Sequence, residues 1–267
     1  MGPLRAETDV ERARWVLDSL GRFGTIDGIV PPVFEAAVRI LHPADHREDR
    51  PVRWREVAEH AGTVLHSLAQ WDDLVGDHPD DYSAPSTGEL PLDELAAIAG
   101  VLARCTATPE DCLAAFWEGF GVLTGSTTIL LSRSGGGAEE PAWMSDTRPT
   151  GWEHPEIAAA EYLSLPGRDC LLFSLDVRAM TDTAWARDSG FADASGMTVQ
   201  TPIALWPEDR AWYLASEIDF DSTVVGGSRE LIDALLALAA EGMIEALPLP
   251  ADADLSSTGD RINRRPR

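Results

Sequence analysis

The sequence predicts an α+β fold in which helices pack on a mainly antiparallel sheet. Apolar residues follow helical spacing in some stretches and alternate in others, but not in the regular strand–helix–strand order of a parallel sheet. Two apolar stretches, 203–206 and 211–218, are separated only by the tight turn 207–210, which is typical of a hairpin. The chain has 267 residues, of which 44% are hydrophobic, and this is enough for a substantial core.

The pattern of apolar residues assigns an element to most of the chain. Thr8 and Glu11 match a capping box, so they predict the start of a helix that runs to about residue 20. Ser228 is a typical N-cap for the last strong helix, 229–241. Between them we expect a strand at 34–41, a charged loop at 43–51, helices at 52–61 and 92–104, a strand at 127–131, a helix at 155–163, a strand at 170–175 and the hairpin 203–218.

The sequence does not decide the secondary structure of two segments. Pro109 suits the first position of a helix, whereas the alternation of Leu113, Ala115 and Trp117 suits a strand. Residues 180–200 are mixed and predict no definite element.

The predicted domain organisation is one α+β domain over residues 1–251. The loops 76–91 and 132–151, which are rich in glycine and proline, could divide it into two lobes. Residues 252–267 are polar and contain four arginines, so we expect a disordered, arginine-rich tail.

Charge and composition argue against several classes of protein. The formal net charge is −24, and all 21 basic residues are arginine. Without lysine, the chain has no Schiff-base lysine, P-loop lysine or pyridoxal-phosphate anchor. The 45 acidic residues argue against a nucleic-acid binder, whose affinity depends on basic side chains, and against attachment to anionic membranes.

The sequence also predicts a cytoplasmic location. The N-terminus is charged and lacks an apolar signal region, and no apolar run reaches the roughly 18 residues of a membrane helix. Cys105, Cys112 and Cys170 form neither a CxxC pair nor an even set, which is typical of buried thiols in a reducing compartment.

Residues 219–223 carry the pattern Asp-x-Asp-x-Thr directly after an apolar strand. This pattern resembles the first motif of the haloacid-dehalogenase-type phosphohydrolases. The resemblance implies that Asp219 attacks phosphorus, Asp221 protonates the leaving group and Thr223 holds the phosphoryl oxygens, with Mg²⁺ beside the carboxylates. That family carries the motif near its N-terminus, whereas only 44 residues follow Thr223 here. The competing interpretation is a strand end whose polar side chains bond the turn backbone.

Residues 206–212 place two tryptophans around a charged turn. Trp206 and Trp212 flank Asp209 and Arg210. Aromatic faces beside these charges could bind a planar or cationic ligand. Alternatively, Arg210 stacks on a tryptophan and pairs with Asp209, which would fix the hairpin.

Four further side chains are candidate ligand-binding residues. His66 and Gln70 could line a cleft, and Glu118 lies beside Trp117 among aromatic residues that could raise its pKa. Five of the six histidines lie between residues 42 and 78, but Pro43 argues against helical spacing of the first pair, and no cysteine or tight carboxylate pattern completes a site. We therefore predict no metal or cofactor, except Mg²⁺ under the phosphohydrolase alternative.

The segments around His42, Trp54, His66 and Trp117, together with 206–212, resemble a group of uncharacterised actinobacterial proteins. The resemblance spans about residues 24–247. It implies a compact single unit of that length and no particular activity.

The leading functional hypothesis is a non-catalytic cytoplasmic binding protein with an acidic surface, comparable to immunity proteins or regulatory proteins that neutralise a basic partner. Residues 1–251 hold 42 acidic residues and 17 arginines, a net charge of −25, so a basic protein partner should contact this part. The alternatives are a Mg²⁺-dependent phosphohydrolase that uses Asp219 and Asp221, and a small-ligand sensor that uses the 206–212 turn.

Overall fold

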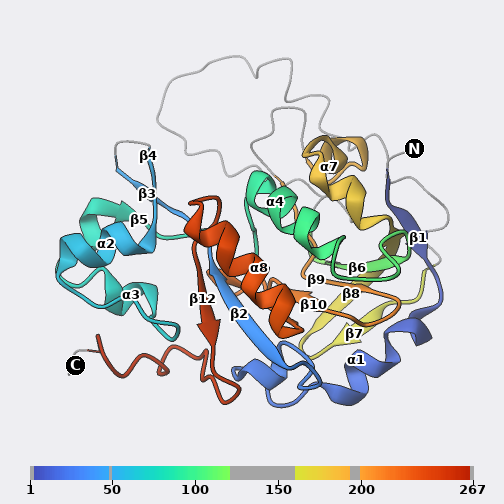
Figure 1. Cartoon of the computed structure of the whole chain (residues 1–267), viewed down its shortest axis with the longest axis horizontal. Helices are drawn as coiled ribbons and strands as arrows, with labels where there is room; N and C mark the ends of the chain where they lie inside the picture. The colour runs from blue at the N-terminus through green and yellow to red at the C-terminus, as the bar shows by residue number, and fades with distance from the viewer. Residues whose placement is uncertain (1–2, 48–49, 121–159, 193–198, 265–267) are drawn as a thin grey trace, which may run out of the picture.

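The computed structural model describes residues 3–47, 50–120, 160–192 and 199–264, and it confirms the α+β class (Figure 1). The described strands are β1 (Arg5–Glu7), β2 (Ala36–Leu41), β3 (Ala44–His46), β4 (Arg50–Val52), β5 (Tyr82–Ser83), β6 (Cys112–Trp117), β7 (Leu163–Leu165), β8 (Arg168–Leu175), β9 (Ala204–Pro207), β10 (Tyr213–Ala215), β11 (Ser222–Gly227) and β12 (Ala246–Leu249). The described helices are α1 (Arg14–Ser19), α2 (Trp54–Ala61), α3 (Trp71–Leu74), α4 (Leu92–Leu102), α7 (Ala184–Asp188) and α8 (Arg229–Ala240), with 3₁₀ turns η1 (Val10–Ala13), η2 (Ile26–Gly28), η3 (Pro79–Asp81) and η5 (Val177–Thr181).

Two antiparallel sheets organise the described residues. The larger has nine strands in the order β1-β8-β6-β9-β10-β11-β2-β12, with β7 paired to β8 beside this path. The smaller has the order β4-β3-β5 and lies with α2 and α3 beyond the β2–β12 edge (Figure 1). No helix in the described ranges is long and apolar enough to cross a membrane.

Most predicted elements form near their expected bounds. The hairpin forms as β9 and β10, and the strand alternative after Pro109 is confirmed as β6. Helix α8 starts at the predicted cap, because Ser228 Oγ accepts the backbone N–H of Leu231 at 3.2 Å. The predicted strand 127–131, the loop 132–151 and most of the predicted helix 155–163 lie outside the described residues.

Three expectations differ from the structure. The charged loop at 43–51 contains β3 and β4, and the 76–91 segment supplies β5 to the same small sheet. The first helix begins as the 3₁₀ turn η1, and its N-cap is Asp9 instead of Thr8, because the Asp9 carboxylate accepts the Glu11 N–H at 3.1 Å. Short strands and 3₁₀ turns bury few side chains, so they leave little apolar pattern to find.

The expected disordered tail also differs from the structure over residues 252–264. Ala253 and Leu255 are buried against the main core, and Asp260 is fully buried against the segment before α3. The last three residues, 265–267, lie outside the described part.

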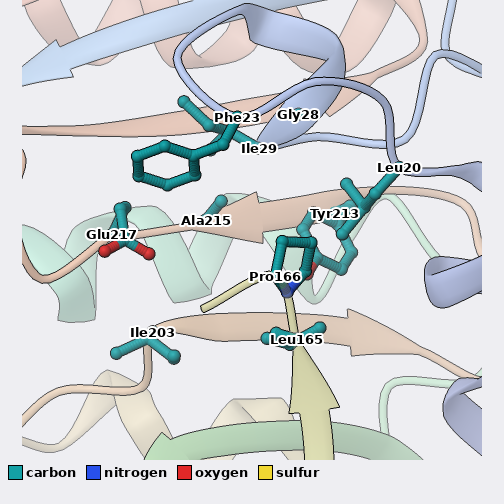
Figure 2. A pocket seen from close by; sticks show the side chains of 10 residues that line it. All are labelled: Leu20, Phe23, Gly28, Ile29, Leu165, Pro166, Ile203, Tyr213, Ala215 and Glu217. Atoms are coloured by element: carbon teal, nitrogen blue, oxygen red, sulfur yellow. The ribbon is translucent and has the colours of Figure 1, made fainter. Parts of the chain in front are cut away.

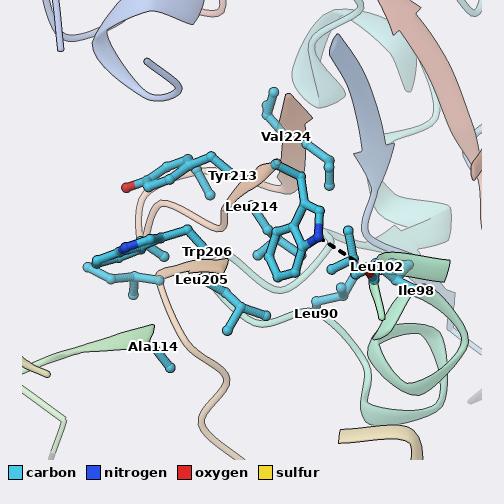
Figure 3. Packing of buried hydrophobic residues seen from close by; sticks show 14 of the residues in the cluster. Leu90, Ile98, Leu102, Ala114, Leu205, Trp206, Tyr213, Leu214 and Val224 are labelled. Atoms are coloured by element: carbon cyan, nitrogen blue, oxygen red, sulfur yellow. Dashed lines mark hydrogen bonds between the residues drawn. The ribbon is translucent and has the colours of Figure 1, made fainter. Parts of the chain in front are cut away.

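Alternation along β10 divides the core between the two faces of the large sheet. Trp212, just before the strand, points toward α4, where its Nε1 donates to the Leu102 carbonyl at 3.0 Å (dashed line, Figure 3). Tyr213 points to the opposite face and stacks on Trp206. Helix α1 covers that face, since Trp15 meets the Tyr213 ring edge-on. Both faces of β10 are therefore buried, as expected for a central strand.

Candidate functional site

The two aspartates of the 219–223 segment form separate ion pairs. Asp219 is exposed and pairs with Arg168 from β8, whereas Asp221 accepts from Arg39 of β2 at 3.1 Å. Each carboxylate thus has its own guanidinium partner. This arrangement favours the strand-end interpretation over a Mg²⁺ ion shared between the two aspartates.

Thr223 is fully buried within β11 and forms part of a hydrogen-bonded chain. Its Oγ1 lies 2.9 Å from His42 Nε2 and 2.8 Å from Ser216 Oγ, and His42 Nδ1 lies 2.8 Å from the Ser86 carbonyl oxygen. Because a carbonyl only accepts, Nδ1 carries the proton and Nε2 accepts from the Thr223 hydroxyl. Burial lowers the pKa of His42 to about 4, so the ring is neutral near pH 7.

Both tryptophans of the 206–212 turn are fully buried. Trp206 stacks on Tyr213 with 5.6 Å between ring centroids, and Trp212 bonds the Leu102 carbonyl within the core (Figure 3). The ring faces are occupied by protein atoms. The turn therefore presents no tryptophan face to a ligand in solution.

The charged side chains of this turn brace the hairpin. Asp209 accepts from Thr106 Oγ1 at 2.8 Å and from the Ala107 N–H at 2.7 Å. Arg210 lies with its guanidinium carbon 5.3 Å from the ring centroid of Trp15. The expected stacking of Arg210 thus occurs on α1 and not within the turn, because the turn's own tryptophans point into the core.

Trp117 and Glu118 lie where β6 ends beside β8. Trp117 is half-buried against Phe120, with 5.7 Å between ring centroids. The backbone N–H of Glu118 donates to the Asp169 carbonyl at 2.9 Å, and its side chain is half-buried. These contacts are typical of the end of a strand. Residues 121–159, which follow it, lie outside the described residues.

Arg39 forms a buried polar centre between the large sheet and the small one. The residue is 2% exposed. It donates to Ser222 Oγ at 2.8 Å and to the Ala69 carbonyl at 2.8 Å, in addition to its ion pair with Asp221. Its guanidinium carbon lies 5.5 Å from the ring centroid of Trp54. Four neighbours from three separate segments of the chain thus meet at one cation.

His66 and Gln70 lie at this same junction. Asp260 Oδ1 lies 3.0 Å from His66 Nε2, and Asp260 Oδ2 accepts the Gln70 N–H at 3.4 Å. The negative charge of Asp260 also acts on the Arg39 guanidinium. Gln70 Nε2 is buried and has no partner among the described residues. His66 and Gln70 therefore contact Asp260, whereas the predicted Asp221 contacts Arg39 in the same packed junction.

A small hollow lies between the segment after α1 and strand β10 (Figure 2). Its volume of about 30 Å³ suits a water molecule or two, far below the several hundred Å³ of small-molecule sites. Glu217 faces it, and burial raises the pKa of this carboxyl. Arg168 Nη2 bonds Glu217 at 2.9 Å, so the hollow is bordered by an ion pair. The lining residues are Leu20, Phe23, Gly28, Ile29, Leu165, Pro166, Ile203, Tyr213, Ala215 and Glu217.

Three carboxylates converge on Arg12 at the surface of the described residues. Its guanidinium donates hydrogen bonds to the carboxylates of Glu7 at 2.7 Å, Asp111 at 2.6 Å and Glu208 at 2.8 Å. These three carboxylates come from β1, the start of β6 and the β9–β10 turn. We call the acidic end these three carboxylates together with their neighbours in the chain and with Asp176, which shares Arg178 with Glu110; it consists of Glu7, Asp9, Glu11, Glu110, Asp111, Asp176, Glu208 and Asp209.

One group of side chains has the composition of a metal site. His60, His78 and Asp81 place ligand atoms within 4.8 Å of one another. The sequence predicts no metal, because no single spacing along the chain links all three ligands: His60 lies in α2, whereas His78 and Asp81 lie at η3. The i, i+3 spacing of His78 and Asp81 is the one part of the group that is visible in the sequence.

The sequence also does not reveal the acidic end. Arg12 is separated from Asp111 by 99 positions and from Glu208 by 196, so only the folded sheet brings them together. No protein-family model, curated protein or solved structure matches this chain.

Proposed function

We propose that this chain is a non-catalytic binding protein that engages a basic protein partner through the acidic end. The observation that carries the proposal is the convergence of three carboxylates on Arg12, with further acidic side chains around them. Arg12, Arg14 and Arg178 pair with carboxylates of the acidic end, so three guanidinium groups face eight carboxylates. The surplus negative charge would attract a basic surface and raise its association rate.

Exposure of these carboxylates supports the proposal. The side chains of Glu11 and Glu110 are 74% and 63% exposed, and their nearest cations lie at 3.9 Å and 3.8 Å. Asp111 and Glu208 are 49% and 46% exposed even while they bond Arg12. Such carboxylates keep free lone pairs that a partner's arginine or lysine could use. An immunity-like role and a regulatory role would both use this chemistry.

A cytoplasmic location belongs to the same proposal. Cys112 and Cys170 are buried as free thiols, and Cys105 is half-buried as a free thiol. Burial raises the pKa of Cys112 to about 12, so this thiol stays protonated and unreactive. Unpaired, inert cysteines suit a reducing compartment.

Affinity capture from the native extract with three baits tests the proposed function. The baits are the wild type, the acidic-end variant Glu11→Gln/Glu110→Gln and a control, Asp233→Asn/Glu241→Gln. The control removes the same charge from exposed positions in α8 and at its C-cap. We expect the wild type and the control to retain a stoichiometric basic protein at low salt. The acidic-end variant should lose it, as should the wild type at roughly 0.5 M salt. Equal capture by all three baits, or an acidic partner, would contradict the proposal.

A further inference from the structure

The region around the small sheet contains a second feature, which goes beyond the proposed partner binding. Helix α2 ends at residue 61, and His60 lies in its last turn. The 3₁₀ turn η3 places His78 at its N-cap and Asp81 at its last position. Because a 3₁₀ helix has three residues per turn, side chains at i and i+3 lie on the same side. The two elements thus direct two imidazoles and one carboxylate toward a common point.

The distances suit a tetrahedral metal ion. His60 Nε2 lies 3.5 Å from Asp81 Oδ2, and His78 Nδ1 lies 3.2 Å from the same oxygen. Two ligands bound to a tetrahedral zinc ion at its usual bond lengths lie about 3.3 Å apart. The two histidine rings meet edge-on with 4.6 Å between centroids, and the three ligand atoms all lie within 4.8 Å of one another.

The backbone holds this group in place. The Asp81 N–H donates to the His78 carbonyl at 3.1 Å, and the Asp81 carbonyl accepts from the Arg47 N–H at 3.1 Å. Tyr82, the next residue, packs against the His60 ring with 6.1 Å between centroids. The ligands are therefore fixed from two sides, by the 3₁₀ turn and by the edge of β3.

We propose that His60, His78 and Asp81 bind one Zn²⁺ ion. Two imidazoles and one carboxylate are a ligand set that zinc accepts, whereas Mg²⁺ and Ca²⁺ prefer oxygen ligands alone. The three side chains are 51%, 40% and 46% exposed, so the fourth coordination position faces solvent. Water or a side chain from another molecule would occupy it.

Titration calorimetry of the full-length protein with zinc chloride tests this site. We expect one ion per chain, no comparable heat with magnesium chloride, and affinity weakened by more than about tenfold in His60→Gln and in His78→Gln. The matched control is Asp80→Asn, which removes a neighbouring carboxylate that is 92% exposed and is not among the three ligands.

Thermal unfolding provides a second readout. Zinc binding only to the folded state should raise the Tm of the wild type and of Asp80→Asn, but not that of His60→Gln or His78→Gln. Circular dichroism without zinc would verify that both histidine variants fold. The proposal is wrong if the wild type shows no saturable binding, or if Asp80→Asn weakens binding as much as the histidine variants do.

Discussion

At the scale of single residues, arginine carries the ionic chemistry of this lysine-free chain. Arg12 bonds three carboxylates, Arg168 bonds two, and Arg39 donates to four groups in the core. A planar guanidinium has five donors and can serve several acceptors at once, whereas a lysine ammonium is a compact point charge. The arginine-only composition therefore matches how the structure uses its cations.

Arg39 should be the residue whose loss destabilises the fold most clearly. In Arg39→Met, the largely buried Asp221 loses its counter-charge, and we expect the free energy of unfolding to fall by about 3 kcal/mol. The double variant Arg39→Met/Asp221→Asn should recover part of this loss, because it removes the unpaired charge. Urea unfolding followed by tryptophan fluorescence measures both. A loss below about 1 kcal/mol in the single variant would show that the pair contributes little.

His42 should make stability depend on pH. Its pKa is lowered from 6.5 to about 4 in the folded state, so between these values the unfolded chain binds the extra proton. The free energy of unfolding should therefore fall as the pH drops through this window, by up to about 3 kcal/mol.

The variant His42→Gln isolates this contribution. Glu94 acts in the opposite direction, since burial raises the pKa of its carboxyl to about 7, so the His42 contribution is the difference between wild type and variant. Urea unfolding at several pH values gives that difference, and NMR titration of the ring gives the pKa directly. A ring that titrates near 6.5 would refute the assignment of His42 as a buried neutral group.

At the scale of elements, the sequence predicts the strands and helices that are long and have a regular apolar pattern. Strand β2, helix α4 and helix α8 each carry enough apolar residues in register to be recognised. The sequence does not predict the small sheet, because its strands have two or three residues and lie within charged or proline-rich segments. Residues 252–264 are polar in sequence, but the burial of Ala253 and Leu255 and the contacts of the buried Asp260 determine their place.

Helix α8 offers a test at this scale. Ser228→Ala removes the side-chain acceptor for the Leu231 N–H and should lower the free energy of unfolding by about 1 kcal/mol. The exposed Ser257→Ala is the control and should change stability by less than about 0.5 kcal/mol. Denaturant unfolding of both variants measures the difference. Equal stability of the two would mean that the cap contributes nothing to this helix.

At the scale of the whole molecule, the sequence shows the net charge but not where a candidate site lies. Net charge alone favours an acidic binding protein, but the candidate residues chosen from local motifs are mostly buried or paired in the fold. The acidic end and the histidine–aspartate group arise from contacts between distant segments, which a single sequence does not reveal. Net charge follows from composition alone, whereas a site depends on how the fold brings distant residues together.

The most direct test of the proposed function is the dissociation constant of the captured partner, measured by calorimetry at low salt. Glu11→Gln/Glu110→Gln should weaken binding by more than about tenfold, which corresponds to about 1.4 kcal/mol. Asp233→Asn/Glu241→Gln, with the same change in net charge, should stay within about twofold of the wild type. Equal weakening by the two variants, or none by either, would contradict a binding surface at the acidic end.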